Sequence, residues 1–162
     1  MAIRKIVVLG EDEVLHKHAR RVEKFDERLA ELMTDLGETM RASDGLGLAA
    51  PQVGVLKRCC VVDMEGTILE LVNPEVTETE GEVTVIEGCL SVPGRAGRVA
   101  RPEKVTVKAQ DRFGKPMEIH GEGMLAVCLC HEIDHLDGIV YVDKMIEDAT
   151  EEMRRRQGGE GK

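Results

Sequence analysis

Hydrophobic residues recur at the spacing of an α-helix between residues 26 and 43. One face of such a helix would carry five apolar side chains, Leu29, Leu32, Met33, Leu36 and Met40. Asp26 stands where its carboxylate can cap the first turn. The pattern therefore predicts an amphipathic helix over 26–43. The next segment, GLGLAAPQVG at 45–54, has three glycines and a proline and requires a special backbone geometry.

The centre of the chain has patterns that are typical of β-strands. Between residues 57 and 87, three segments are rich in β-branched residues and read RCCVVDM, TILELV and EVTVIEG. Residues 103–121 predict a hairpin, in which KVTVKAQ and PMEIHGE are joined by the turn DRFGK. Because neighbouring residues on a strand point to opposite faces, we expect Cys59 and Cys60 to do so. Pro93 and Gly94 predict a further turn.

Helical spacing returns over residues 122–136. Beyond this segment we predict a short strand near Val140, a final helix from about Met145 to Arg156, and a frayed tail over 157–162. Strands in the middle and helices at both ends indicate an α+β fold. In this fold, antiparallel β-sheets pack around the helix at 122–136, with further N-terminal and C-terminal helices. The length of 162 residues predicts a single domain over 1–162.

Composition excludes several kinds of partner. The net charge is −9, and the chain has no Trp, one Tyr and two Phe, which argues against a domain-wide basic or base-stacking surface for nucleic acid. Sequence-specific binding of nucleic acid is therefore not expected. Positive charge clusters locally at Arg95, Arg98 and Arg101 and again at 154–156. We interpret both clusters as solvated surface, although Arg95 is also a candidate to neutralise a carboxylate on a substrate.

The chain has no pattern of a membrane or secreted protein. No apolar run approaches the roughly 18 residues of a membrane helix, and the short apolar stretch at 6–9 is followed by acidic residues rather than a signal-peptide core. We therefore expect a cytoplasmic location and no contact with a membrane. The five cysteines form no CxxC pair, which favours free thiols or metal ligation over disulfides, at positions Cys59, Cys60, Cys89, Cys128 and Cys130.

The strongest chemical signal is the segment HEIDH at 131–135. On a helix, His131 and His135 lie on the same face and can bind one divalent cation. Glu132 would lie beside that cation without binding it, where a general base for a coordinated water is needed. The apolar stretch at 124–130 leads into this segment, so the helix is expected to be buried.

A catalytic site of this type needs a third protein ligand, and the residues offer several. A metzincin would have a histidine where Tyr141 stands. A thermolysin-like site would use a downstream glutamate, but little chain follows His135 to carry its scaffold. Cys89, between Gly88 and a strand-like pair, is the better candidate because a thiolate is a strong ligand for soft metals. Cys128 lies on the same helix face as His131 and is a competing ligand.

Three segments together resemble a known family. GLGLAAPQVG at 45–54, EGCLSVPG at 87–94 and HEIDHLDG at 131–138 are similar to the three signature motifs of peptide deformylase, in the same order and spacing. The resemblance covers essentially the whole chain. It implies that the metal ligands are Cys89, His131 and His135. The family usually holds Fe2+, and its site also accepts Zn2+, Ni2+ or Co2+.

The resemblance also implies a reaction and its residues. The substrate would be the N-formyl-methionyl end of newly synthesised polypeptides, and the product would be formate. Glu132 corresponds to the acid/base that activates the metal-bound water. Gln52 and the Leu90 N–H correspond to the groups that bind the oxyanion. The substrate-binding positions implied by the family are Leu46, Gly47, Gly88, Val127, Cys128 and His131. The family further implies a transient contact with the ribosome through the C-terminal helix.

One position departs from the family pattern. Cys130 precedes the HEIDH segment where the family usually has glutamine, and we interpret it as a small buried apolar residue. Two other functions stay open at this point. One is a metallopeptidase of a different specificity, which would cleave internal peptide bonds. The other is a deformylase-like protein that binds a metal or the ribosome without catalysis.

Overall fold

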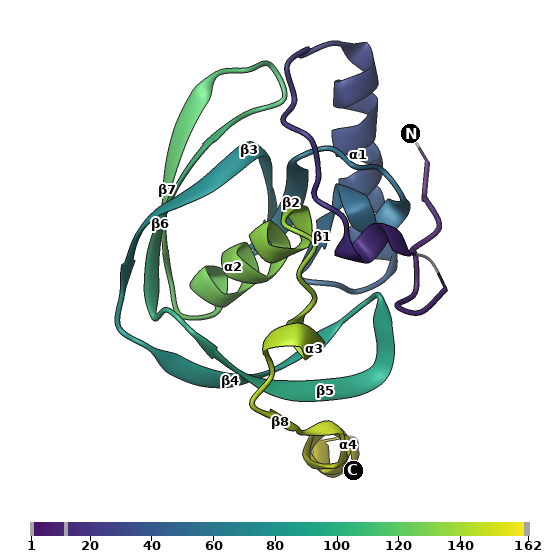
Figure 1. Ribbon diagram of the computed structural model, residues 1–162, viewed down its shortest axis with the longest axis vertical. Coiled ribbons are helices and arrows are strands. Elements are labelled where there is room, and N and C mark those ends of the chain that lie inside the picture. The colour runs from purple at the N-terminus through teal and green to yellow at the C-terminus, as the bar shows by residue number, and fades with distance from the viewer. Residues whose placement is uncertain (1, 12, 161–162) are drawn as a thin grey trace.

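The computed structural model describes residues 2–11 and 13–160, and its strands form two sheets (Figure 1). Every pairing between these strands is antiparallel. The larger sheet has the order β1-β2-β3-β6-β7, formed by Gly47–Ala49, Cys59–Met64, Thr67–Glu80, Lys104–Gln110 and Pro116–Glu122. The smaller sheet has the order β4-β5-β8, formed by Val83–Cys89, Val92–Arg101 and Glu147–Asp148.

Four α-helices and two 3-10 helices complete the described chain. The α-helices are α1 Glu27–Ala42, α2 Met124–Leu136, α3 Tyr141–Lys144 and α4 Thr150–Glu160. The 3-10 helices are η1 Glu13–His16 and η2 Ala50–Val53. This architecture confirms the predicted α+β fold with antiparallel sheets around the helix that carries HEIDH. None of the helices in the described ranges has the length and hydrophobicity needed to span a membrane.

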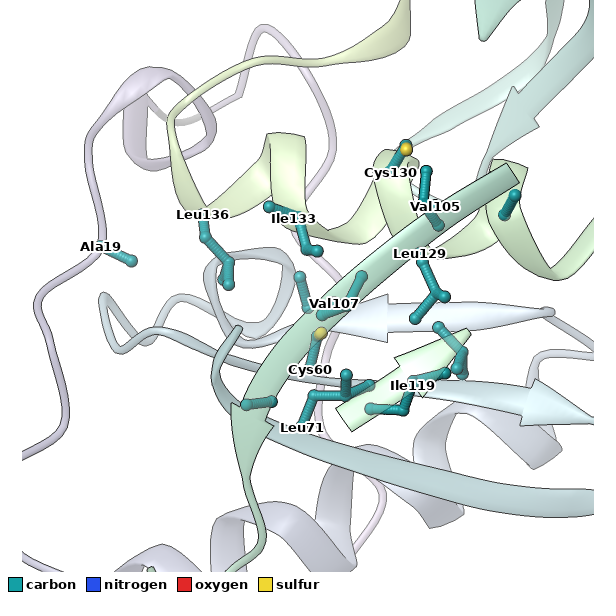
Figure 2. Packing of buried hydrophobic residues seen from close by; sticks show 14 residues of the cluster. Ala19, Cys60, Leu71, Val105, Val107, Ile119, Leu129, Cys130, Ile133 and Leu136 are labelled. Atoms are coloured by element: carbon teal, nitrogen blue, oxygen red, sulfur yellow. The ribbon is translucent and has the colours of Figure 1, made fainter. Parts of the chain in front are cut away.

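Helix α2 forms the centre of the main hydrophobic core. Figure 2 shows Leu129 and Ile133 of α2 directed toward side chains of the larger sheet, among them Cys60 and Val107. The α2 side chains on this face are almost fully buried, so the opposite face of the helix is free to present its histidines to the smaller sheet. Burial of one face of α2 therefore determines that the histidines on its other face point toward the smaller sheet.

Helix α1 forms as the apolar spacing predicts. All five residues of its apolar face are buried in a second core between α1 and strand β2. Asp26 accepts a hydrogen bond from the Leu29 N–H at 3.0 Å, and this bond lowers the pKa of the Asp26 carboxyl. Cys59 lies in this core and Cys60 in the main core, which confirms that the two side chains point to opposite faces of β2.

The structure corrects the predicted turn at Pro93 and Gly94. Both residues lie inside β5, and the chain reverses instead at Leu90 and Ser91, directly after Cys89. Gly94 has a φ of +75°, a left-handed conformation that favours glycine, and it adopts this conformation without ending the strand. The reversal places Cys89 opposite Val92, at the end of the β4–β5 ladder.

The predicted elements after residue 136 are also wrong in detail. Val140 is not on a strand, because it caps helix α3, and its N–H bonds to the Asp143 carboxylate at 2.8 Å. Met145 is extended, and the next residue donates its N–H to the Arg98 carbonyl of β5 at 2.7 Å. Pairing with β5 therefore delays the last helix to Thr150. Its backbone continues through residues 157–160, where a frayed tail was predicted, and residues 161–162 lie outside the described chain.

Candidate metal centre and catalytic cleft

Three predicted ligands meet between α2 and the smaller sheet. Cys89 ends strand β4, and His131 and His135 lie one helical turn apart on α2. Their ligand atoms all lie within 4.8 Å of one another, and the Cys89 Sγ is 3.4 Å from the His135 Nε2. One thiolate and two imidazoles are a donor set that suits a divalent transition metal. His135 is fully buried, and its Nε2 faces the Cys89 Sγ, where a shared metal would give this buried nitrogen a strong partner. Its Nδ1 has no hydrogen-bond partner among the described residues.

A buried acidic residue orients His131. The Glu87 carboxylate of β4 lies 2.7 Å from the His131 Nδ1 and leaves the Nε2 of that ring available for a metal. Burial by itself would raise the pKa of Glu87, but hydrogen bonds from His131 and Arg101 outweigh it and hold the pKa below its usual value. Sequence reasoning assigned Glu87 no role. The sequence signal that could have indicated a role for Glu87 was its position on a predicted strand, two residues before the candidate ligand Cys89.

Arg101 corrects the prediction of a solvated arginine cluster. It is only 3% exposed and makes two hydrogen bonds to Glu87, at 2.6 and 2.9 Å, and one to Asp134 at 2.6 Å. Arg98, three residues earlier, pairs with Glu147 on the other side of the strand. Residues separated by an odd number along a strand face opposite ways, which explains why Arg101 is buried while Arg98 is not.

Glu132 is the buried carboxyl next to the three ligands. Burial raises its pKa to about 7, and its Oε1 has no hydrogen-bond partner within the described chain. Gly47 of β1 lies against it so closely that a Cβ at Gly47 would be 2.5 Å from the Glu132 Oε2. A carboxyl held in this way, with a pKa near neutrality, can both accept and return a proton.

Gln52 directs its amide toward Cys89. Its Oε1 accepts the Ala49 N–H at 3.0 Å, which leaves the Nε2 to donate to the Ser91 Oγ at 3.2 Å and to face the Cys89 Sγ at 3.5 Å. Gln52 comes from η2, the segment for which the glycines and proline required a special geometry. Leu90 follows Cys89 in the reversal between β4 and β5, so the two predicted oxyanion donors lie beside the same ligand.

A cleft of about 560 Å3 opens over these residues. With the exception of buried His135, it is lined by every predicted site residue, Leu46, Gly47, Gln52, Gly88, Cys89, Leu90, Val127, Cys128, His131 and Glu132. The residues that line it and that sequence reasoning did not select include Met124 of α2 and Met153 of α4. No motif marks either methionine. Met153 reaches the cleft only because strand β8, which precedes α4, pairs with β5.

The competing ligands lie apart from the candidate metal site. Cys128 lines the cleft, but burial raises the pKa of its thiol to about 12, which disfavours the thiolate that a metal would need. Cys130 packs in the main core as a small apolar residue, as interpreted. Tyr141, where a metzincin would have its third histidine, is buried with its ring 6.3 Å from that of His131. The cluster of potential ligands in the described residues contains none of these three.

Known proteins resemble this chain over nearly its whole length. Residues 3–151 match the family model of polypeptide deformylase. The chain belongs to the polypeptide deformylase family. It is 55% identical over 161 residues to a peptide deformylase of Caldicellulosiruptor bescii, with 98% of this chain and 96% of that protein covered. The resemblance seen in the three motifs is thereby confirmed, and the chain is an enzyme of the deformylase family.

Solved structures of family members share the fold. A peptide deformylase from Legionella pneumophila is 53% identical and superposes with a TM-score of 0.87, covering 96% of this chain and 92% of that one. A second, from Synechococcus elongatus in complex with actinonin, is 39% identical with a TM-score of 0.85 and covers 95% of this chain and 85% of that one. Family membership and the Cys-His-His donor set together support a divalent metal.

The contact between Gly47 and Glu132 leads to a first prediction. We expect Gly47→Ala to lower kcat by at least about tenfold, because the new Cβ would force the buried carboxyl out of position and even a 1 Å displacement is costly in catalysis. Steady-state kinetics with a formylated peptide would test this, with bound metal counted in both proteins. An unchanged kcat at equal metal content would show that the position of Glu132 tolerates the methyl group.

Proposed function

We propose that this chain removes the N-formyl group from the formyl-methionyl end of newly synthesised polypeptides and releases formate. The observation that carries this proposal is that Cys89, His131, Glu132 and Gln52 line one cleft, with buried His135 in the same cluster of potential ligands. The proteins to which the chain is similar are named peptide deformylases, which supports the same substrate class.

We propose that Cys89, His131 and His135 hold one divalent cation, with Fe2+ as the natural ion and Zn2+, Ni2+ or Co2+ as substitutes. When bound, such an ion supplies Lewis acidity that lowers the pKa of a coordinated water toward neutrality. The thiolate and imidazole donors accept several of these ions, so the donor set supports the class of metal rather than one element. The hydrogen bond that the His131 Nδ1–H donates to Glu87 holds the ring in the orientation that this role needs.

The proposed proton transfers use Glu132. It takes a proton from the attacking water, whose oxygen bonds to the formyl carbon, and then delivers a proton to the leaving methionine nitrogen as the C–N bond breaks. The pKa of about 7 suits both steps, because a group that titrates near the working pH is an efficient base and an efficient acid. The Gln52 amide and the Leu90 N–H stabilise the oxyanion, and one such donor is typically worth about 3 kcal/mol.

The proposed substrate position follows the two rims of the cleft. We propose that the peptide backbone pairs with Leu46, Gly47 and Gly88 in the manner of an added strand. The methionine side chain would enter between Val127, Cys128 and His131, which are buried or half-buried walls of the cleft. Leu46 is 52% exposed at the rim, which suits a residue that is covered only when a substrate binds.

Formate release tests the proposal most directly. The protein would be purified without oxygen, its metal counted, and a short formyl-Met peptide offered beside the same peptide with an acetyl group. We expect formate from the first peptide and no acetate from the second. Cleavage of internal peptide bonds would instead indicate a metallopeptidase. Binding without formate, at full metal content, would indicate a non-catalytic protein.

We also propose that residues 1–162 act as one catalytic domain in the cytoplasm and contact the ribosome transiently through α4. The support is the proposed substrate, which emerges from ribosomes, together with the exposed arginines at 154–156 of that helix. Such a contact should weaken steeply with salt, because a few arginines would carry it. Sedimentation of the protein with ribosomes at low and high salt is the measurement.

A further inference from the structure

We propose that a basic pocket beside the catalytic cleft binds a carboxylate on the substrate, one or two residues beyond the formyl-methionine. The inference rests on the proposed function and adds a preference among its substrates. The pocket has a volume of about 270 Å3. Its lining includes Gly88, Gly94, Arg95, Thr150, Met153 and Arg154.

The pocket is continuous with the catalytic cleft. Gly88 and Met153 line both cavities, and Gly88 is one of the positions proposed to pair with the substrate backbone. A peptide that leaves the cleft past Gly88 therefore enters the pocket. Consecutive residues of an extended chain advance by at most about 3.6 Å, so one or two residues beyond methionine reach this neighbouring space.

Helix α4 is held firmly enough to serve as a wall. The Ala96 N–H of β5 donates to the Thr150 Oγ1 at 3.1 Å, and the Ala149 N–H donates to the Ala96 carbonyl at 2.9 Å. Arg98 of β5 adds a hydrogen bond to Glu147 at 2.7 Å. These contacts bind the start of α4 to the same sheet that carries Cys89 and Gly88, so the pocket keeps a constant position relative to the metal centre.

The two arginines of the pocket retain donors for a ligand. Arg154 donates to a backbone carbonyl, that of Gly94 at 3.4 Å, rather than to a carboxylate. Arg95 has Asp148 as an ion-pair partner only at 3.9 Å, with both side chains about half exposed. Asp148 is the acidic group that faces them, and its carboxylate is already engaged by the Thr150 N–H at 2.7 Å.

A carboxylate is the ligand that this arrangement fits. Guanidinium groups bind carboxylates through paired N–H donors, and Gly88 and Gly94 leave room for a peptide to approach. The net charge of −9 opposes acidic ligands at long range, but this field is screened beyond about 8 Å at physiological salt. Contacts within the pocket therefore decide the preference. Exposed ion pairs of this kind are modest, and we expect an effect of about two- to five-fold.

The test compares peptides that differ only at one side chain. Formyl-Met-Ala-X-Ala-amide and formyl-Met-X-Ala-Ala-amide would be assayed with X as Glu, Gln and Lys. A tripeptide with uncharged side chains, formyl-Met-Ala-Ala, would be offered with a free or an amidated C-terminus, which separates the effect of a side-chain carboxylate from that of a terminal one. We expect the acidic form in at least one pair to have the higher kcat/KM, mainly through KM. The ratio of kcat/KM for the acidic form to that for the neutral form should approach one in about 1 M salt, where the Debye length is only about 3 Å.

Variants on α4 and β5 assign the effect to the pocket. Arg95→Gln and Arg154→Gln should each reduce the ratio of kcat/KM for the acidic peptide to kcat/KM for the neutral peptide toward one. Arg155→Gln is the matched control, because it removes the same charge from the same helix, and Arg155 does not line the pocket. An equal loss of the ratio in Arg155→Gln would overturn the proposal in favour of a general field. The proposal would also be overturned if the unchanged protein had equal kcat/KM for the acidic and neutral peptides, or if it preferred the lysine peptide.

Failure of the proposed function gives a different result. If the neutral glutamine peptide releases no formate from the metal-loaded protein, then the deformylase reaction itself is wrong, and the preference is overturned with it. If that peptide reacts normally and the acidic peptides gain nothing, only the carboxylate pocket is wrong.

Discussion

Glu132→Gln is expected to lower kcat by about 10²- to 10⁴-fold while the protein still binds its metal. This range is typical for the loss of a general acid or base. Glutamine keeps the volume and polarity of the side chain, but it cannot take a proton from water or return one to the leaving amine. Because Glu132 is not in the cluster of three potential ligands, its replacement should leave the metal content unchanged. Single-turnover formate release and metal analysis on the same sample are the measurements.

Glu147→Gln is the matched control for this experiment. Glu147 is an exposed carboxylate on β8 that contacts Arg98, and the same chemical change there should leave kcat within a factor of about two. Turnover by Glu132→Gln at a rate close to that of the unchanged protein would contradict the acid/base role. Loss of metal from that variant would instead place Glu132 among the ligands.

Cys89→Ala is expected to lower metal affinity by more than about 100-fold. Loss of a group that merely orients a ligand costs about 10- to 100-fold, so loss of a direct ligand should cost more. The variant would keep only the two imidazoles of α2, which is fewer than the three protein ligands of catalytic sites of this type. Metal per chain after dialysis against a weak chelator, and formate release with and without added metal, would measure the effect.

Cys128→Ala is the control for the removal of a thiol from the same cleft. Cys128 lines the cleft but lies outside the cluster of potential ligands, so this variant should keep its metal. Full retention of metal by Cys89→Ala, with loss in Cys128→Ala, would exchange the two assignments. Loss in both would point to a general weakening of the fold, which thermal unfolding would reveal.

The arginine network gives the site a rigid support. Arg101 lies between Glu87 and Asp134, and Glu87 in turn contacts His131, so strand β5 and both ends of the HEIDH segment are connected through buried charges. Lys144 extends the network to the surface through Asp134 at 3.1 Å. A buried arginine stays charged, and its hydrogen bonds therefore help to hold Glu87 as a carboxylate, with the pKa of Glu87 below its usual value.

Local patterns were sufficient for the elements whose cause is local. The apolar spacing and Asp26 determined helix α1, and the DRFGK turn determined the β6–β7 hairpin, because capping and turn geometry depend on residues close in sequence. The i, i+4 spacing alone places His131 and His135 on one face of α2. Strand β3 was harder, since it continues from the predicted TILELV through Asn73 and Pro74 to Glu80, where no apolar alternation marks it.

The amino-acid sequence by itself identified the family of this protein, and the residues proposed as metal ligands and as catalytic groups all stand in three short motifs. Tertiary structure alone decided which distant residues support them. Cys89 and His135 are 46 positions apart, and Arg101 reaches both Glu87 and Asp134. The start of α4, and with it the place of Met153 in the cleft, depends on pairing between β8 and β5. Such contacts join elements across the fold, and their energy comes from burial and pairing that no local pattern encodes.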